Sequence, residues 1–185
     1  MIVFDKVSLK YPYDDCAVIK DASFSLVNGV NTVLCDVQSG KSSLCKLLIK
    51  EASPTSGKIL LDGEGICGIT NERLGILYLP NKPAFFENRS VLFNIAYPLA
   101  VRKVAKGERL QKAREIAERL QIPDVNVKAS RLDGEMRKRA ALARGLAVSR
   151  RVVLFDDFFD GAEYIDEVLE QFDADIKAVF TSDSS

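Results

Sequence analysis

The sequence predicts an α/β fold, and three features of the chain lead to this prediction. Residues 33–43 run from an apolar strand end through a small turn into a Gly-Lys-Ser segment that opens an amphipathic helix. Residues 151–155 have the continuous apolar character of a strand buried in a parallel sheet, and two aspartates follow them. Between these landmarks the pattern changes from strand-like alternation to helical periodicity. These parts, in this order, predict a P-loop nucleotide-binding fold.

The turn before the first helix has the chemistry of a phosphate-binding loop. Gly40 lets the backbone approach an anion closely, Lys41 supplies positive charge to the β- and γ-phosphates, and the Ser42 hydroxyl can bind Mg²⁺. The copy is incomplete, because the usual pattern has glycine where this chain has Cys35. A solvated turn that merely starts a helix is the alternative reading of these residues. The candidate cofactor-binding positions here are Gln38, Ser39, Gly40, Lys41, Ser42 and Ser43.

The carboxylates that end the second apolar strand complete the expected site. Asp156 is the candidate for holding Mg²⁺ through water, while the loop holds the phosphates that the metal neutralises. An acid after an apolar run is weak evidence alone, since it occurs wherever a strand meets a loop. Together with the Gly-Lys-Ser segment it predicts that ATP and Mg²⁺ are the cofactors.

The remaining elements follow from local patterns. Alternating segments and turn residues predict strands, and Asn28-Gly29 predicts a hairpin that makes the opening of the chain antiparallel. The expected strands are residues 3–11, 22–27, 31–34, 58–63, 75–79, 151–155 and 176–180. The expected helices lie within residues 42–51, 91–121, 134–148 and 161–172. The inward positions of the segment at 108–120 are Leu110, Ala113, Ile116, Ala117 and Leu120.

Composition narrows the function classes. The chain has 185 residues, enough for one domain with a proper core, and 26 basic residues balance 26 acidic ones. The lack of net charge argues against a nucleic-acid partner.

The four cysteines include no C-x-x-C pair, which argues against a zinc site or a disulfide framework. The absence of histidine excludes His-based acid–base catalysis and His metal ligation. The N-terminus lacks the pattern of a signal peptide, so a cytoplasmic location is expected.

With these features in place, the chain resembles the ATP-binding domain of ABC transporters along nearly its whole length. Residues 131–146 resemble the LSGGQ signature and its basic helix, and residues 152–156 occupy the Walker B position. Residues 78–86 resemble the Q-loop, and residues 90–95 resemble the start of the helical lobe. Tyr11 stands where the family stacks an aromatic ring on adenine. The signature positions that match in register are Leu132, Gly134, Arg137, Arg139, Ala143, Arg144 and Leu146.

The resemblance implies a single ABC-type ATP-binding domain over residues 1–185. It would combine mixed and antiparallel β-structure with a parallel sheet flanked by helices, and a helical subdomain at about residues 87–131. By the same resemblance, the catalytic positions are Asp157, Asn81 and Ser182, and the metal positions are Ser42, Asp156 and Asn81. The signature-loop positions are Leu132, Asp133, Gly134 and Glu135.

Simpler readings remain open for several of these residues. Tyr11 could be only an aromatic residue at a strand edge. The basic positions from Arg137 to Arg144 could form a solvated helix face, and Gly134 could be a plain loop glycine.

Departures from the family pattern leave hydrolysis open. The residue after the Walker B aspartate is Asp157 rather than glutamate, one methylene shorter, and a misplacement of about an ångström can cost on the order of a hundredfold in rate. Asn81 replaces the Q-loop glutamine, and Ser182 replaces the switch histidine. Asp133 and Glu135 place carboxylates in the signature loop, where a partner's γ-phosphate would dock and be repelled.

Three functions are compatible with this pattern. The first is an ATP-binding subunit that couples ATP binding and weak hydrolysis to a membrane permease, at the inner face of the membrane. The second is a non-hydrolysing, degenerate module that pairs with an active ABC subunit and regulates it. The third is an ABC-type protein without a membrane partner. The acidic signature loop leads us to expect a heterodimer with another ABC ATPase subunit rather than a homodimer.

Overall fold

The computed structural model describes residues 1–36, 40–148, 150–159 and 165–182. The chain divides into two compact units. The core unit comprises Met1–Asn81 and Arg150–Ser185, and the helical unit comprises Lys82–Ser149. The range of about 87–131 suggested for a helical subdomain lies inside the second unit. No helix in the described ranges combines the length and the apolar character needed to span a bilayer.

The first sheet of the core unit is antiparallel. Its strand order is β2-β1-β4-β5, formed by β1 (Ile2–Leu9), β2 (Ile19–Leu26), β4 (Ser56–Leu61) and β5 (Glu64–Gly65). In β1 the buried residues alternate in two pairs, Ile2 and Phe4, then Val7 and Leu9, on either side of an irregularity in the strand pairing. The sequence therefore predicted β1, β2 and β4, whereas β5 was not expected.

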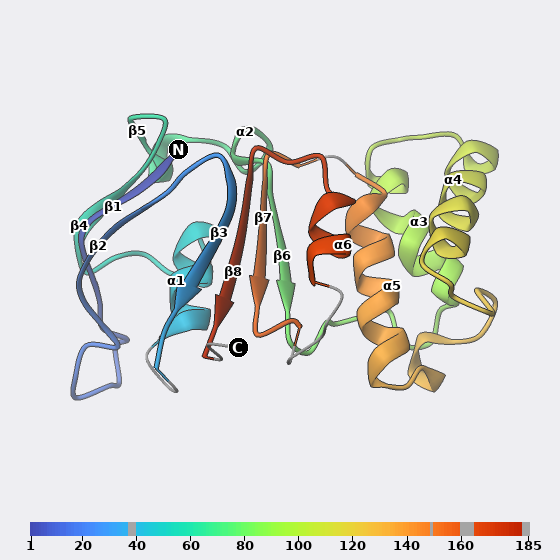
Figure 1. The fold of residues 1–185 in the computed structure, drawn as a ribbon, viewed down its shortest axis with the longest axis horizontal. Helices are drawn as coiled ribbons and strands as arrows, with labels where there is room; N and C mark the ends of the chain where they lie inside the picture. The colour runs from blue at the N-terminus through green and yellow to red at the C-terminus, as the bar shows by residue number, and fades with distance from the viewer. Residues whose placement is uncertain (37–39, 149, 160–164, 183–185) are drawn as a thin grey trace. The chain divides into compact units, whose positions relative to one another are not determined.

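The second sheet of the core unit is parallel, with the strand order β3-β8-β7-β6. Its strands are β3 (Gly29–Leu34), β6 (Ile76–Pro80), β7 (Val152–Asp156) and β8 (Ile176–Thr181), which Figure 1 shows side by side. Every residue of β7 is buried, as its continuous apolar sequence predicted. Since the strands are parallel, their carboxyl ends meet at one edge of the sheet.

The prediction of a hairpin at Asn28-Gly29 is wrong. β3 follows this turn but pairs with β8 in the second sheet instead of returning along β2. The turn is held by Asn31, whose side chain accepts from the Val27 N–H and donates to the Val27 carbonyl. These local bonds stabilise the turn without strand pairing, so the chain is free to cross from one sheet to the other.

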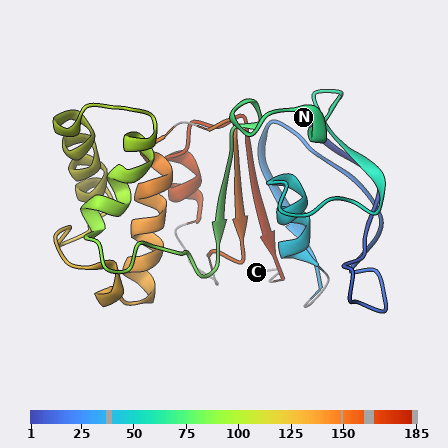
Figure 2. The ribbon, with the colours of Figure 1, turned by 180° about the vertical axis from the view of Figure 1, so that it is seen from behind.

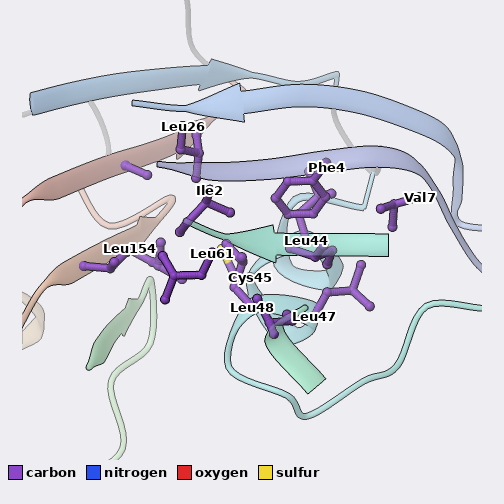
Figure 3. Packing of buried hydrophobic residues seen from close by; sticks show 14 of the residues in the cluster. Ile2, Phe4, Val7, Leu26, Leu44, Cys45, Leu47, Leu48, Leu61 and Leu154 are labelled. Atoms are coloured by element: carbon purple, nitrogen blue, oxygen red, sulfur yellow. The ribbon is translucent and has the colours of Figure 1, made fainter. Parts of the chain in front are cut away.

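The helix that begins at Lys41 packs between the two sheets. α1 (Lys41–Leu48) buries Leu44, Cys45, Leu47 and Leu48. Figure 3 shows these side chains among buried residues of the antiparallel sheet and Leu154 of β7. The core therefore fixes the start of α1 relative to the carboxyl ends of the parallel strands. The core unit also contains α2 (Asn71–Leu74), α6 (Ile165–Glu170) and a 3₁₀ turn at Ile66–Gly68.

The helical unit contains α3 (Val91–Val101), α4 (Lys106–Arg119) and α5 (Gly134–Leu146), which lie against one another in both views (Figures 1 and 2). A 3₁₀ turn at Ala129–Arg131 precedes α5. The inward face of α4 is confirmed at Ala113, Ile116, Ala117 and Leu120, which are buried, whereas Leu110 is half-buried. The segment expected to be helical at residues 91–121 thus contains two helices. The helix expected at 161–172 is seen as α6, and residues 161–164 lie outside the described part of the chain.

Candidate functional site

The phosphate-loop candidate lies where α1 begins. Gly40 precedes α1 with a φ of 88°, in the left-handed region that favours glycine. No side chain caps this helix end, and its first turn has no acidic residue. The N–H groups of that turn, together with the helix dipole, therefore favour an anion. Gln38 and Ser39, which the sequence assigns to the same loop, lie outside the described residues.

Replacing Gly40 by alanine should destabilise the protein. A Cβ at this position would lie 2.9 Å from Val18 Cγ1 and 3.2 Å from the Val18 carbonyl oxygen, and the left-handed backbone adds strain. We expect Gly40→Ala to lower the free energy of unfolding in urea by about 2 kcal/mol. Gly107→Ala is the matched control, because Gly107 lies in α4 with open space around it, and it should stabilise by roughly 0.5–1 kcal/mol. Equal effects of the two substitutions would contradict this account.

Lys41 forms an ion pair across the site. Its Nζ lies 3.2 Å from Oδ2 of Asp157, and its side chain is only 9% exposed. Asp157 follows β7 with a φ of 44°, and its N–H donates to the Phe180 carbonyl of β8 at 2.9 Å. The structure thus brings together the two residues that the sequence assigns to phosphate binding and catalysis. In this state Asp157 neutralises Lys41, and a phosphate would have to compete with it.

Asp156 is the buried end of β7. The residue is 4% exposed, Oδ2 accepts a 2.7 Å hydrogen bond from the Tyr78 hydroxyl, and Oδ1 has no hydrogen-bond partner. Leaving a buried carboxylate oxygen unpaired is costly, so this atom suits a ligand that supplies positive charge or a donor. A hydrated Mg²⁺ fits this requirement, and Ser42, which is exposed at the start of α1, is the candidate for a second oxygen ligand.

The protein groups alone do not make a metal centre. Within the described ranges, no cluster of three or more His, Cys, Asp or Glu side chains could hold a metal ion. Mg²⁺ would therefore need oxygen ligands from the nucleotide, which is the usual arrangement for this ion. Burial, followed by the negative charge of the nearby Asp156, raises the pKa of the Cys45 thiol in α1.

Tyr11 lies beside the phosphate-loop helix. Its hydroxyl and the Ser43 hydroxyl are 3.1 Å apart and hydrogen-bonded, and the half-buried ring packs against the core. This contact links the end of β1 to the first turn of α1. It gives Tyr11 a structural role, and stacking on adenine stays a prediction.

Asn81 and Ser182 are both exposed and lie at the carboxyl edge of the parallel sheet. Asn81 directly follows β6 and Ser182 directly follows β8, on either side of β7. The strand order therefore places both near the end of β7, where Asp156 and Asp157 lie. Their catalytic and metal-binding roles stay predictions.

The signature-loop candidates lie in the helical unit. Leu132 is half-buried, and Asp133 caps α5 by accepting a 2.8 Å hydrogen bond from the Met136 N–H. Gly134 is the first residue of α5, and Glu135 pairs with Arg139 at 2.7 Å. Both carboxylates thus have local partners. The Asp133 carboxylate also occupies the helix end that would otherwise favour an anion.

Two arginines of α5 hold residues 84–87, the segment that follows Asn81. The sequence did not reveal these contacts. Arg137 pairs with Glu87, and its guanidinium lies over the Phe85 ring, 5.0 Å from the centroid. Arg144 lies over the same ring at 4.7 Å and donates to the Ala84 carbonyl at 2.7 Å. Burial lowers the pKa of Arg144. The interpretation as a solvated helix face is therefore wrong for these two residues. They anchor residues 84–87 to α5.

The comparisons with known proteins agree with this geometry. The profile of the ABC transporter family matches residues 19–160, and the chain belongs to this family. It is 37% identical over 143 residues to the molybdate/tungstate import ATP-binding protein of Thermococcus kodakarensis, covering 76% of this chain and 43% of that protein. The protein of the same name from Methanocaldococcus jannaschii is 36% identical over 140 residues, covering 75% of this chain and 47% of the relative. The chain thus spans less than half the length of these relatives.

The fold of the chain is also similar to that of solved ABC proteins. A bacterial Atm1-family ABC exporter with ATP bound superimposes with a TM-score of 0.81 at 20% identity, over 97% of this chain and 34% of that one. The predicted α/β P-loop fold with an ABC-type core is therefore confirmed.

Proposed function

We propose that this chain is the ATP-binding subunit of an ABC transporter, which couples ATP binding to a membrane permease. One observation carries the proposal. At the uncapped start of α1, the buried Lys41 forms an ion pair with Asp157, which directly follows Asp156 and its partnerless Oδ1. A basic anion site next to a free carboxylate oxygen is suited to a phosphate chain carrying Mg²⁺. Membership of the ABC transporter family supports the same conclusion.

Each residue of the site has a role in this proposal. Lys41 and the first turn of α1 bind the phosphates, and Tyr11 stacks on the adenine. Ser42 and Asp156 would hold Mg²⁺, and Asn81 would contribute at the same edge of the sheet. Bound Mg²⁺ supplies charge neutralisation of the phosphate oxygens. Once Lys41 has moved from Asp157 to the phosphate, Asp157 orients the attacking water. Ser182 can donate a hydrogen bond but supplies no positive charge.

Hydrolysis distinguishes this subunit from a non-hydrolysing regulatory module. The short side chain of Asp157 and its ion pair with Lys41 both oppose turnover, so we expect slow release of phosphate. Binding of radiolabelled ATP by equilibrium dialysis, followed by a phosphate-release assay, tests both parts. Binding with slow release supports the proposal, and binding with no release favours the regulatory module. Absence of binding would contradict both.

The preferred partner is another ABC ATPase subunit. In a sandwich of two such domains, the start of each signature helix faces the other subunit's γ-phosphate. Here Asp133 already fills that position on α5 with its own carboxylate. Glu135 adds further negative charge, which Arg139 only partly offsets because both side chains are partly exposed. We therefore propose a heterodimer, in which the partner supplies an intact signature loop to this chain's Lys41.

The expected result for the isolated chain is that Mg-ATP does not produce a tight homodimer. Sedimentation velocity of the wild type and of Asp157→Asn, each with and without excess Mg-ATP, should show monomers throughout. The Asp157→Asn variant removes the candidate water-orienting carboxylate, so that hydrolysis does not disperse a dimer. Combining Asp157→Asn with Asp133→Ser and Glu135→Gly should promote ATP-dependent dimers. An ATP-dependent dimer of the chain with its own signature loop would contradict the heterodimer proposal.

We also propose that the permease and a location at the cytoplasmic face of the membrane complete the assembly. The helical unit exposes an apolar surface that suits a protein partner, formed by Phe86, Phe93 and Tyr97, which are 45%, 37% and 39% exposed. The relatives' names make molybdate and tungstate the first cargo to test. Co-purification with the permease distinguishes this assembly from an ABC-type protein without a membrane partner.

A further inference from the structure

A tyrosine on the neighbouring strand contacts the candidate metal ligand. Tyr78 lies in the middle of β6 and pairs with Leu154 of β7, whereas Asp156 pairs with Pro80. Because side chains alternate along a strand, Tyr78 and Asp156 point to the same face of the sheet, two positions apart. The tyrosine ring spans this offset, and its hydroxyl donates a 2.7 Å hydrogen bond to Asp156 Oδ2.

The surroundings keep this hydroxyl a donor. Tyr78 is half-buried and packs against the core cluster that includes α1 and β7. Burial raises the pKa of its phenol, and the hydrogen bond and negative charge of Asp156 raise it further. In this arrangement the Tyr78 hydroxyl is the donor and Asp156 Oδ2 is the acceptor.

The bond makes the two oxygens of Asp156 inequivalent. Oδ2 is occupied by Tyr78, and Oδ1 is buried without a partner. A carboxylate held at one oxygen cannot rotate freely, so the direction in which Oδ1 points is fixed as well. Partners of metal-binding side chains that orient them in this way commonly contribute 10–100-fold to metal affinity.

We propose that Tyr78 is a positioning residue for Mg²⁺ binding, which holds Asp156 through Oδ2 and leaves Oδ1 for the hydrated ion. This inference rests on the proposed function, since the ion would arrive with a nucleotide. It gives β6 a role in metal binding through Tyr78, which precedes Asn81, the residue in place of the Q-loop glutamine. The role is separate from phosphate binding, which depends on Lys41 and the start of α1.

The test compares nucleotide affinity with and without the metal. Calorimetric titration with ADP, once in EDTA and once in excess Mg²⁺, gives the factor by which Mg²⁺ strengthens binding. ADP is used so that no turnover occurs. We expect Tyr78→Phe, which removes only the hydroxyl, to reduce this factor by about tenfold and to leave the affinity in EDTA unchanged. Electron paramagnetic resonance of Mn²⁺ in the presence of ADP should show the same loss of bound metal.

Two variants make the result specific. Tyr13→Phe removes the same group from a residue that is 99% exposed, and it should behave as the wild type. Asp156→Asn should lose the Mg²⁺-dependent gain at least as completely as Tyr78→Phe. An unchanged or larger Mg²⁺ factor in Tyr78→Phe would overturn the inference, and so would equal losses with and without the metal, which indicate a structural role. If the wild type binds no ADP in either buffer, the proposed function fails and this inference with it.

Discussion

Replacing Lys41 by alanine should weaken ATP binding by at least tenfold. The substitution removes the positive charge at the start of α1 and leaves Asp157 facing the phosphates without its 3.2 Å partner. A charge-assisted hydrogen bond to phosphate contributes about 1.5–3 kcal/mol, which corresponds to roughly a tenfold change or more in Kd. Displacement of a fluorescent ATP analogue measures the effect.

Lys46 offers a matched control for this experiment. It lies in the last turn of the same helix, and its side chain is exposed. Lys46→Ala should retain wild-type affinity, because it changes the net charge equally without touching the candidate site. Equal affinities of the wild type and Lys41→Ala would show that phosphate binds elsewhere.

The second large effect is expected at Asp157. Asp157→Glu lengthens the side chain by one methylene and should raise phosphate release, by up to about a hundredfold if the reach to water limits the rate. The structure adds a cost that the sequence did not show. Asp157 has a positive φ of 44°, which aspartate tolerates better than glutamate, so the same change should lower the free energy of unfolding by about 1 kcal/mol.

Asp157→Asn separates these two effects. Asparagine also tolerates the left-handed backbone, so this variant should avoid the backbone strain expected for glutamate while releasing less phosphate. It also removes the negative charge beside Lys41, and its affinity for ATP should rise. If Asp157→Glu leaves phosphate release unchanged, the short side chain is not the limiting feature, and Ser182 becomes the next position to substitute.

The local features of the fold were predictable from the sequence. The buried strand β7 was visible as a continuous apolar run, and the start of α1 was visible as a glycine, a lysine and a serine before an amphipathic segment. Both are properties of neighbouring residues. The partner of β3 was not predictable, because β8 lies more than a hundred residues away along the chain and the Asn28-Gly29 turn looks like a hairpin.

In the candidate site, too, the local features were predictable and the long-range contacts were not. Lys41 and Asp156 could be named because their motifs lie within a few residues of a strand end. The Tyr78 hydrogen bond depends on the register between β6 and β7, which a sequence does not show. The Lys41–Asp157 ion pair and the contacts of Phe85 with two arginines likewise depend on tertiary packing. Tyr78 itself was visible in the sequence, two positions before the end of its strand, but its partner was not.

The most direct test of the account is a calorimetric titration of the purified chain with Mg-ATP. Binding at one site per chain is expected, with the affinity reduced at least tenfold in Lys41→Ala and unchanged in Lys46→Ala. A titration of the wild type that shows no binding of Mg-ATP, on protein whose folded state is verified by circular dichroism, would contradict the assignment of this site to a nucleotide.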